Sequence, residues 1–197
     1  MRELLLEVFG GAPGAPDAET VWPSPSHHDD ASPFRSAAVL VPLIAHPGGM
    51  TVLLTQRTET LRVHAGQISF PGGRFAPGDA TPEDTALRET EEEIGIARHH
   101  VELIGRLTEH ETGTGFRVVP VVGLLRPPVA VTVDPGEVDH AFEAPLDFVL
   151  DPANHRYETR RHNGVEREFC VVSWGDYYIW GLTARVLFEL SRKVRKV

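Results

Sequence analysis

The segment 72–96 constrains this chain more than any other, because it opens on paired glycines and closes on a strongly acidic helix. Thr81 can cap that helix, Pro82 suits its first position, and Asp84 can return a hydrogen bond to the cap. Gly95 is a suitable end, because the residue that follows a helix often takes a left-handed conformation. The sequence therefore predicts about three turns of helix between these signals.

The predicted helix carries one apolar face and one crowded acidic face. The residues that can be buried together are Ala86, Leu87, Thr90 and Ile94. Glu89, Glu92 and Glu93 are spaced i, i+3 and i+4, and Glu91 adds a fourth acid. Like charges one turn apart destabilise a helix by roughly 0.2–0.5 kcal/mol per pair, and the helix dipole disfavours them near its C-terminus. Two explanations stay open on these grounds: a solvated acidic surface, or a site for a hard divalent cation such as Mg²⁺ or Mn²⁺.

The spacing of the whole segment resembles the Nudix box, G-x5-E-x7-R-E-U-x-E-E-x-G-U, in which U is a bulky aliphatic residue. The pairs Arg88-Glu89 and Glu92-Glu93, followed by Gly95 and Ile96, stand where the pattern requires them. Two regions depart from it. Thr90 stands at the first U position. In the loop, Asp79 replaces the glutamate, and eight residues rather than seven lead from it to Arg88. The shorter acid puts the role of that position in doubt, whereas an insertion in a loop is tolerated.

A second stretch, 53–73, is similar to the motif of the coenzyme A pyrophosphatase subgroup, L-L-T-x-R-[S/A]-x3-R-x3-G-x3-F-P-G-G. Every fixed position matches except Thr58, and the longer gap before Arg88 is usual in that subgroup. The segment 179–185, which reads Ile-Trp-Gly-Leu-Thr-Ala-Arg, resembles the subgroup as well. The matches are spread over about two thirds of the chain and leave the N-terminal arm uncovered.

The resemblance implies metal-dependent hydrolysis of the pyrophosphate of coenzyme A or its derivatives. The products would be adenosine 3′,5′-bisphosphate and 4′-phosphopantetheine or an acylated form. Glu89 and Glu93 would hold Mg²⁺ or Mn²⁺, Glu92 would bind a further ion or orient a water, and Arg88 would hold Glu92 or Glu89 in place. The residues expected to contact the substrate are Arg57, Arg62, His64, Gly66, Gln67, Phe70, Gly72 and Gly73. Arginine forks suit phosphate, and glycines allow close approach of a backbone to a ligand.

The general base is not assigned by the sequence. Family members place it differently, and some place it on a loop outside the box. The candidates are Glu109, Glu111 and Glu137, with His110 as a fourth. Each of them could equally be an ordinary loop residue.

The rest of the chain predicts an α/β fold. The predicted strands cover 36–45, 50–55, 101–107, 116–125 and 167–174, the last with a hairpin partner at 155–160. A short helix is expected over 1–9 and a longer one from Tyr178 onward, while 142–150 fits either helix or strand. These elements agree with the α/β/α sandwich and mixed sheet that the Nudix resemblance implies. We expect an N-terminal helix and flexible arm over 1–33 and a single Nudix domain over 34–197.

Composition narrows the partners and the location. A formal net charge of −9 argues against nucleic acid or an anionic membrane bound through a basic surface. It does not exclude a phosphorylated small molecule, because a metal ion and a few local arginines set the field in a site. Cys170 is the single cysteine, so no disulfide framework forms within the chain and a cytoplasmic location is expected. No apolar run approaches the roughly 20 residues that cross a bilayer, and the oligomeric state is not indicated.

Three alternatives remain beside coenzyme A hydrolysis. The enzyme could act on another nucleoside diphosphate linked to a second group, such as a nucleotide sugar. The fold could serve as a non-catalytic binding module, although the intact set of box residues argues against this. The acidic helix could be purely structural, which the spaced glycines disfavour.

Overall fold

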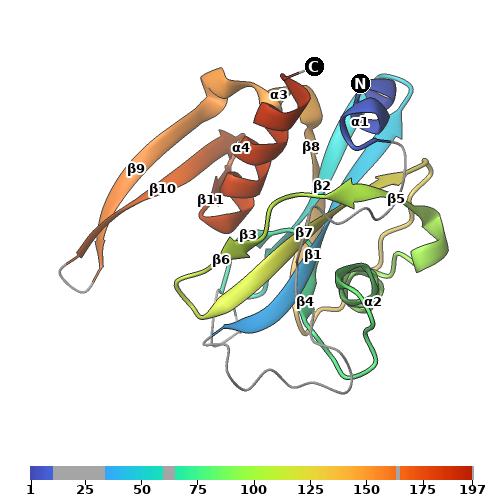
Figure 1. Ribbon diagram of the computed structural model, residues 1–197, viewed down its shortest axis with the longest axis horizontal. Helices are drawn as coiled ribbons and strands as arrows, with labels where there is room; N and C mark the ends of the chain where they lie inside the picture. The colour runs from blue at the N-terminus through green and yellow to red at the C-terminus, as the bar shows by residue number, and fades with distance from the viewer. Residues whose placement is uncertain (11–33, 60–64, 163–164, 197) are drawn as a thin grey trace.

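A computed structural model of the protein shows a mixed β-sheet with helices on both faces (Figure 1). The structure describes residues 1–10, 34–59, 65–162 and 165–196. Within these residues the central sheet consists of β1 (Arg35–His46), β2 (Gly49–Arg57), β3 (Ile68–Ser69), β4 (Gly72–Arg74), β5 (Val101–Arg106), β6 (His110–Glu111), β7 (Phe116–Leu125) and β8 (Val138–Pro145).

Strands β1 and β7 form the middle of the sheet and run parallel, from Arg35 opposite Phe116 to Ile44 opposite Leu125. The main path through the sheet is β3-β2-β1-β7-β5, while β4 pairs with β1, β6 with β7 and β8 with β2. Both central strands are apolar along most of their length because both faces of the sheet are covered. The antiparallel β1–β2 hairpin confirms the strand pair that the sequence predicts.

Pro120 lies inside β7 although a proline has no N–H to give to a neighbouring strand. Its carbonyl accepts a hydrogen bond from the Leu107 N–H at 2.9 Å. Leu107 lies between the end of β5 and the start of β6. The strands that pair with β7 are therefore interrupted at the position where Pro120 has no N–H to donate. The proline is therefore accommodated by this break and not by placement in an edge strand.

Helix α2 (Pro82–Ile94) covers one face of the sheet, and α4 (Leu182–Val194) covers the other (Figure 1). Leu53 and Leu54 are neighbours in β2 and point to opposite faces, so Leu53 packs with Ile94 of α2 while Leu54 joins the larger core with Leu187 of α4. The remaining elements are α1 (Arg2–Val8), α3 (Leu146–Leu150), the 3₁₀ turns η1 (Arg98–His100) and η2 (Pro152–Asn154), and the antiparallel strands β9 (His155–His162), β10 (Val165–Trp174) and β11 (Tyr177–Trp180). This arrangement confirms the predicted α/β fold with a mixed sheet between helices.

The C-terminal region differs from its prediction at one boundary. Residues Tyr177–Trp180 form β11 against β10, and the helix begins only at Leu182. Gly181 separates the two elements with φ 66° and ψ −132°, a conformation that does not continue a helix. The apolar spacing from Ile179 onward fits a helix, but strand pairing decides the structure before the glycine.

At the other end of the chain, α1 confirms the predicted short helix, and its Leu5 is completely buried in the larger core. The segment 142–150, which the sequence leaves ambiguous, contains the end of β8 and then α3. The predicted flexible arm over 11–33 lies outside the described residues.

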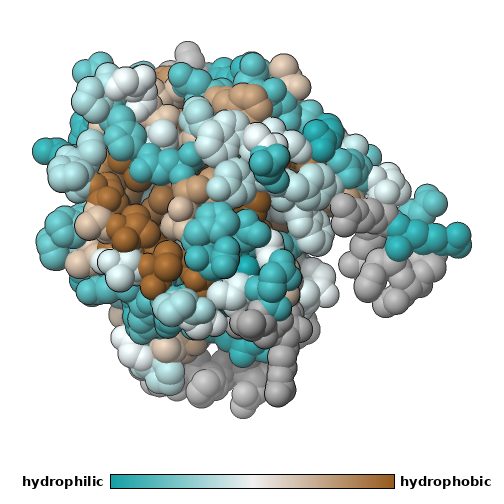
Figure 2. Space-filling view, turned by 180° about the vertical axis from the view of Figure 1, so that it is seen from behind, coloured by the Kyte–Doolittle hydropathy of each residue, from teal (hydrophilic) through white to brown (hydrophobic). Residues whose placement is uncertain are grey.

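Seen from the opposite side, the molecular surface is largely hydrophilic, with one compact hydrophobic area (Figure 2). In the part of the chain that the structure describes, no helix is both long enough and apolar enough to cross a membrane.

Candidate active site

Helix α2 begins and ends as its sequence predicts. The Thr81 hydroxyl accepts a hydrogen bond from the Asp84 N–H at 3.2 Å, and the Asp84 carboxylate accepts one from the Thr81 N–H at 3.1 Å. Gly95 ends the helix with φ 72°, and its N–H donates to the Glu91 carbonyl. Both ends of the acidic helix are therefore fixed, which sets the rotation of every glutamate on it.

Glu93 is an acid in the protein interior, with only 3% of its surface exposed. Its Oε2 accepts a hydrogen bond from the Gly72 N–H at 3.0 Å, and its Oε1 accepts one from Arg57 Nη1 at 3.4 Å. Burial raises the pKa of Glu93 to about 7, even though the Gly72 N–H and the charge of Arg57 act in the opposite direction. The nearby charges of Glu137 and Glu89 raise it further. The environment of Glu93 therefore disfavours its negative charge in the absence of a further cation.

Glu89, one turn earlier on α2, lies against Gly73, the residue that follows Gly72 in β4. A Cβ atom added to Gly73 would lie 2.4 Å from Glu89 Oε2, so only glycine leaves room for this carboxylate. Burial raises the pKa of Glu89, Arg88 lowers it, and the charges of Glu92 and Glu137 raise it again. The two successive glycines of β4 thus each contact one of two neighbouring acids, the buried Glu93 and the partly buried Glu89.

Arg88 holds three acids together. Its Nη1 lies 2.9 Å from both Glu89 Oε1 and Glu92 Oε2. On its other side, Nε and Nη2 donate to the two carboxylate oxygens of Asp79, each at 3.0 Å. Arg88 Nη2 also donates to the Arg74 carbonyl at 2.9 Å, which joins the helix to β4. This arginine fixes the position of Glu89 relative to the glycine strand.

Asp79, to which the sequence assigns no role, lies in this site and bonds to Arg88. It is 3% exposed and, besides the two bonds from Arg88, accepts hydrogen bonds from the Thr85 hydroxyl and the Ala76 N–H. Burial acts to raise its pKa, but the bonds from Arg88 and Thr85 outweigh this and lower the value. The shorter acid therefore serves to orient Arg88. In the sequence, the indication of this role was an acidic residue in the loop before the helix that carries Arg88, because a partly buried arginine needs an acidic partner.

Glu92 does not join Glu89 and Glu93. Its side chain is 60% exposed and contacts Arg88. Successive helical residues are rotated by about 100°, so Glu92 and Glu93 diverge although both neighbour Glu89 on the helix surface. Among the described residues, no three histidine, cysteine or acidic side chains converge closely enough to form a metal-binding group.

The chemistry of the remaining pair nevertheless fits a divalent cation. One buried and one partly buried carboxylate, both with raised pKa values, lie one helical turn apart over a glycine backbone. Mg²⁺ is commonly held by one or two carboxylates, with water and substrate phosphates at its other positions. Glu89 and Glu93 are the donors that this structure offers.

The predicted substrate segment meets this site at Arg57. Its guanidinium is 22% exposed and lies between Glu93 and Glu137, with Nη2 3.8 Å from Glu137 Oε2. The backbone of Arg57 exchanges hydrogen bonds with Gly66 and Gln67, which brings these two predicted residues beside it. Phe70 is 3% exposed and belongs to the larger core, so its side chain packs in the protein interior and is not presented to a ligand as predicted. Two further predicted residues, Arg62 and His64, lie outside the described residues.

Of the four candidate bases, Glu137 is the one brought near the buried acids. Its charge raises the pKa of both Glu89 and Glu93, and its carbonyl accepts a hydrogen bond from the Thr58 N–H. Its side chain is 50% exposed and therefore reaches solvent.

The other candidates lie on the far side of β1 and β7. Glu109 and Glu111 pair with Arg117 at 2.9 and 3.2 Å, and His110 contacts Glu189 at 2.9 Å. Because the strand order there is β4-β1-β7-β6, roughly 14 Å of sheet separates β6 from β4. The structure does not bring these three residues to the carboxylate pair.

Comparison with known proteins identifies the family. Residues 34–168 match the family model described as the NUDIX domain. A protein of Photorhabdus laumondii named Uncharacterized Nudix hydrolase NudL is 40% identical over 161 residues, covering 82% of this chain and 86% of that protein. A protein of the same name from Klebsiella pneumoniae is 39% identical over 172 residues, covering 87% and 88%. The chain belongs to the Nudix hydrolase family.

A solved structure agrees with this assignment at the level of the fold. The MutT/nudix family protein from Enterococcus faecalis aligns with a TM-score of 0.51 at 17% identity, covering 82% of this chain and 62% of that chain. Nudix hydrolases act on nucleoside diphosphate-linked substrates and generally use divalent metal ions such as Mg²⁺ or Mn²⁺.

Proposed function

We propose that this protein hydrolyses the pyrophosphate of coenzyme A or of a coenzyme A derivative. The products would be adenosine 3′,5′-bisphosphate and 4′-phosphopantetheine or its acylated form. One observation carries the proposal: Arg57 of the segment similar to coenzyme A pyrophosphatases bonds to Glu93 of the Nudix helix at 3.4 Å. The stretch that resembles this subgroup and the Nudix box therefore contribute to the same site.

Glu89 and Glu93 are the residues that would hold Mg²⁺ or Mn²⁺. A cation bound there would neutralise phosphate charge and activate a water molecule for attack on phosphorus. Arg88, held by Asp79, keeps Glu89 beside Gly73, which is a positioning role. Glu92 remains the proposed ligand of a further ion or partner of a water, and its exposure leaves it available for either role.

Glu137 is the proposed general base. It is close enough to influence the charge of both buried acids, yet half of its side chain is open to solvent, from which a water must come. Arg57 lies between Glu137 and Glu93 and so holds the base relative to the cation site. The proton released by the attacking water would pass to the Glu137 carboxylate.

Substrate contact by the segment before the box is also a proposal. Arg57 and Arg62 are suited to phosphate oxygens, and His64 and Gln67 can add hydrogen bonds. The backbone of Gly66, Gly72 and Gly73 allows close approach of the ligand. We further propose a cytoplasmic location, since Cys170 is buried and free of any disulfide.

Product analysis tests the proposed function. The protein is incubated with coenzyme A and Mg²⁺, and in parallel with ADP-ribose and a nucleotide sugar. Release of adenosine 3′,5′-bisphosphate from coenzyme A, with slower turnover of the other two, is the expected result. Preferential cleavage of ADP-ribose or of the nucleotide sugar would show that this compound, and not coenzyme A, represents the substrate class. An absence of metal-dependent turnover on all three would favour a binding module.

A further inference from the structure

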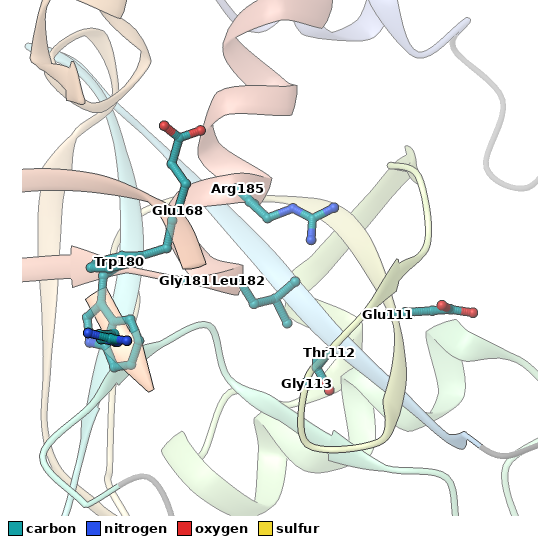
Figure 3. A pocket seen from close by; sticks show the side chains of 10 residues that line it. Glu111, Thr112, Gly113, Glu168, Trp180, Gly181, Leu182 and Arg185 are labelled. Carbon is teal, nitrogen blue, oxygen red and sulfur yellow. The ribbon is translucent and has the colours of Figure 1, made fainter. Parts of the chain in front are cut away.

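A cleft of about 530 Å³ lies between the turn 111–113 and the start of α4 (Figure 3). Its apolar walls come from Phe169, Trp180 and Leu182, and the rings of Phe169 and Trp180 pack edge to face with centroids 5.6 Å apart. The guanidinium of Arg185 extends from α4 toward the turn (Figure 3). The size and the largely apolar lining with a few polar groups are typical of a site for a small molecule.

Half of the residues that line this cleft, including its apolar walls, lie outside the part of the chain that the family shares. The family model ends at residue 168, whereas Phe169, Trp180, Leu182 and Arg185 all follow it. A cleft whose apolar walls lie beyond the common domain is suited to recognise the part of the substrate that differs between family members. In a nucleoside diphosphate-linked substrate, that part is the group attached to the diphosphate.

A chain of hydrogen bonds connects the start of α4, beside the cleft, to the strand that contacts the carboxylate pair. The Thr183 hydroxyl, next to the cleft residue Leu182, donates to the Ile68 carbonyl at 3.0 Å. Ile68 precedes Gly72 by four residues, a stretch of chain that spans at most about 14 Å. Gly72 in turn donates to Glu93. The cleft and the carboxylate pair are therefore joined through a short stretch of chain that contains β3 and β4.

The charges that line the cleft indicate which half of a ligand it would take. Glu111 and Glu168 are balanced by Arg161 and Arg185, so the lining offers no net field for a polyanion. A phosphate-bearing half would be held instead by the cation and arginine of the carboxylate site. The cleft suits a neutral group with methylenes and methyls for the apolar walls and amide carbonyls for Arg185.

We propose that this cleft binds the pantetheine arm of coenzyme A and so determines the substrate specificity of the enzyme. The inference rests on the proposed function, because it takes coenzyme A as the substrate. It assigns Leu182 and Trp180 to the methylene and methyl groups of the arm, and Arg185 to its amide carbonyls.

The test uses the full-length enzyme and the two halves of coenzyme A as competitive inhibitors. Wild-type turnover of coenzyme A is measured first, and its absence would refute the proposed function itself. Leu182→Trp then fills the cleft, Arg185→Gln alters an exposed side chain without burying new volume, and Phe188→Trp on the same helix is the control. Phe188 stacks on His155 and does not line the cleft.

Leu182→Trp is expected to raise the KM for coenzyme A and the Ki of pantetheine about tenfold or more, as loss of fit in an apolar pocket does. Arg185→Gln should raise the same two constants by a smaller factor. The Ki of adenosine 3′,5′-bisphosphate should stay within about twofold in both variants, and Phe188→Trp should leave every constant near the wild-type value.

Two outcomes would overturn the inference while leaving the proposed function intact. In the first, both cleft variants hydrolyse coenzyme A with unchanged KM and unchanged pantetheine Ki. In the second, adenosine 3′,5′-bisphosphate loses affinity while pantetheine does not, which would assign the cleft to the nucleotide half. If Leu182→Trp does not fold, Arg185→Gln decides between these results, because its side chain is exposed.

Discussion

Gly73→Ala is the most selective perturbation of the carboxylate site. The added methyl carbon would lie 2.4 Å from Glu89 Oε2, against 3.4 Å for the shortest ordinary contact, so the carboxylate must retreat by 3.4 − 2.4 Å, about 1 Å. The backbone of Gly73 is not in the left-handed region, so alanine itself is tolerated there. The obstructing atoms are the end of a side chain, and the free energy of unfolding should change by less than about 1 kcal/mol.

A displacement of this size at a reacting centre is expected to reduce kcat about 100-fold. Affinity for Mn²⁺, measured by isothermal titration calorimetry, should fall as well, since Glu89 is a proposed ligand. The calorimetric readout needs no substrate and so does not depend on the identity of the cleaved molecule.

Two neighbouring glycines supply the controls. Gly78→Ala should leave both activity and Mn²⁺ affinity unchanged, because nothing lies within 4 Å of the added carbon. Gly72→Ala should destabilise the fold, because its φ is +148° and the added carbon would lie 2.4 Å from the Ala38 carbonyl oxygen. Wild-type activity and Mn²⁺ affinity in a folded Gly73→Ala variant would refute the placement of Glu89 in the site.

Three further substitutions test the remaining parts of the account. Glu93→Gln should abolish most Mg²⁺-dependent turnover. In EDTA, the difference in free energy of unfolding between wild type and Glu93→Gln should depend on pH. Below the ordinary glutamate pKa of 4.5, the wild-type acid is neutral in both the folded and the unfolded protein. As pH rises through the folded-state pKa of about 7, the wild type should lose up to about 3 kcal/mol of stability relative to the variant, measured by urea unfolding. Equal pH profiles would contradict the burial argument. Asp79→Asn should lower the free energy of unfolding by about 2 kcal/mol at pH 7, measured by the same method. This is less than the loss expected for a fully buried ion pair, because Arg88 is partly exposed. Since the pKa of Asp79 is lowered, this contribution is present above 3.8 and is lost as pH falls through the folded-state value, so an effect that persists at lower pH would speak against the pairing. Glu137→Gln should lower kcat about 100-fold or more while Mn²⁺ affinity stays near wild type, as loss of a general base predicts; an unchanged kcat would return the role to another residue.

The sequence predicted the helix well because its signals are local. Thr81, Pro82 and Gly95 act through hydrogen bonds and backbone conformations within a few residues, so no tertiary information was needed. The same holds for the central strands, whose continuous apolarity follows from burial on both faces. The C-terminal helix is present, but its predicted start at Tyr178 was wrong, because pairing of Tyr177–Trp180 with β10 is a tertiary contact.

The site was predicted only in part, for a related reason. Spacing along a helix brings Glu89 and Glu93 together, but it does not say which side chains enter the interior and which stay with Arg88, as Glu92 does. The role of Asp79 depends on a contact with Arg88 across a loop. The cleft depends on two segments, 111–113 and 161–185, that no local pattern connects.

Glu89 and Glu93, set against Gly72 and Gly73, are the proposed ligands of a divalent cation. The most direct measurement is an anomalous difference map, recorded near the manganese edge, from crystals of the protein grown with MnCl₂. A peak within coordination distance of both carboxylates is the expected result. A peak elsewhere, with Glu93 still hydrogen-bonded to Gly72 and Glu89 still paired with Arg88, would contradict it.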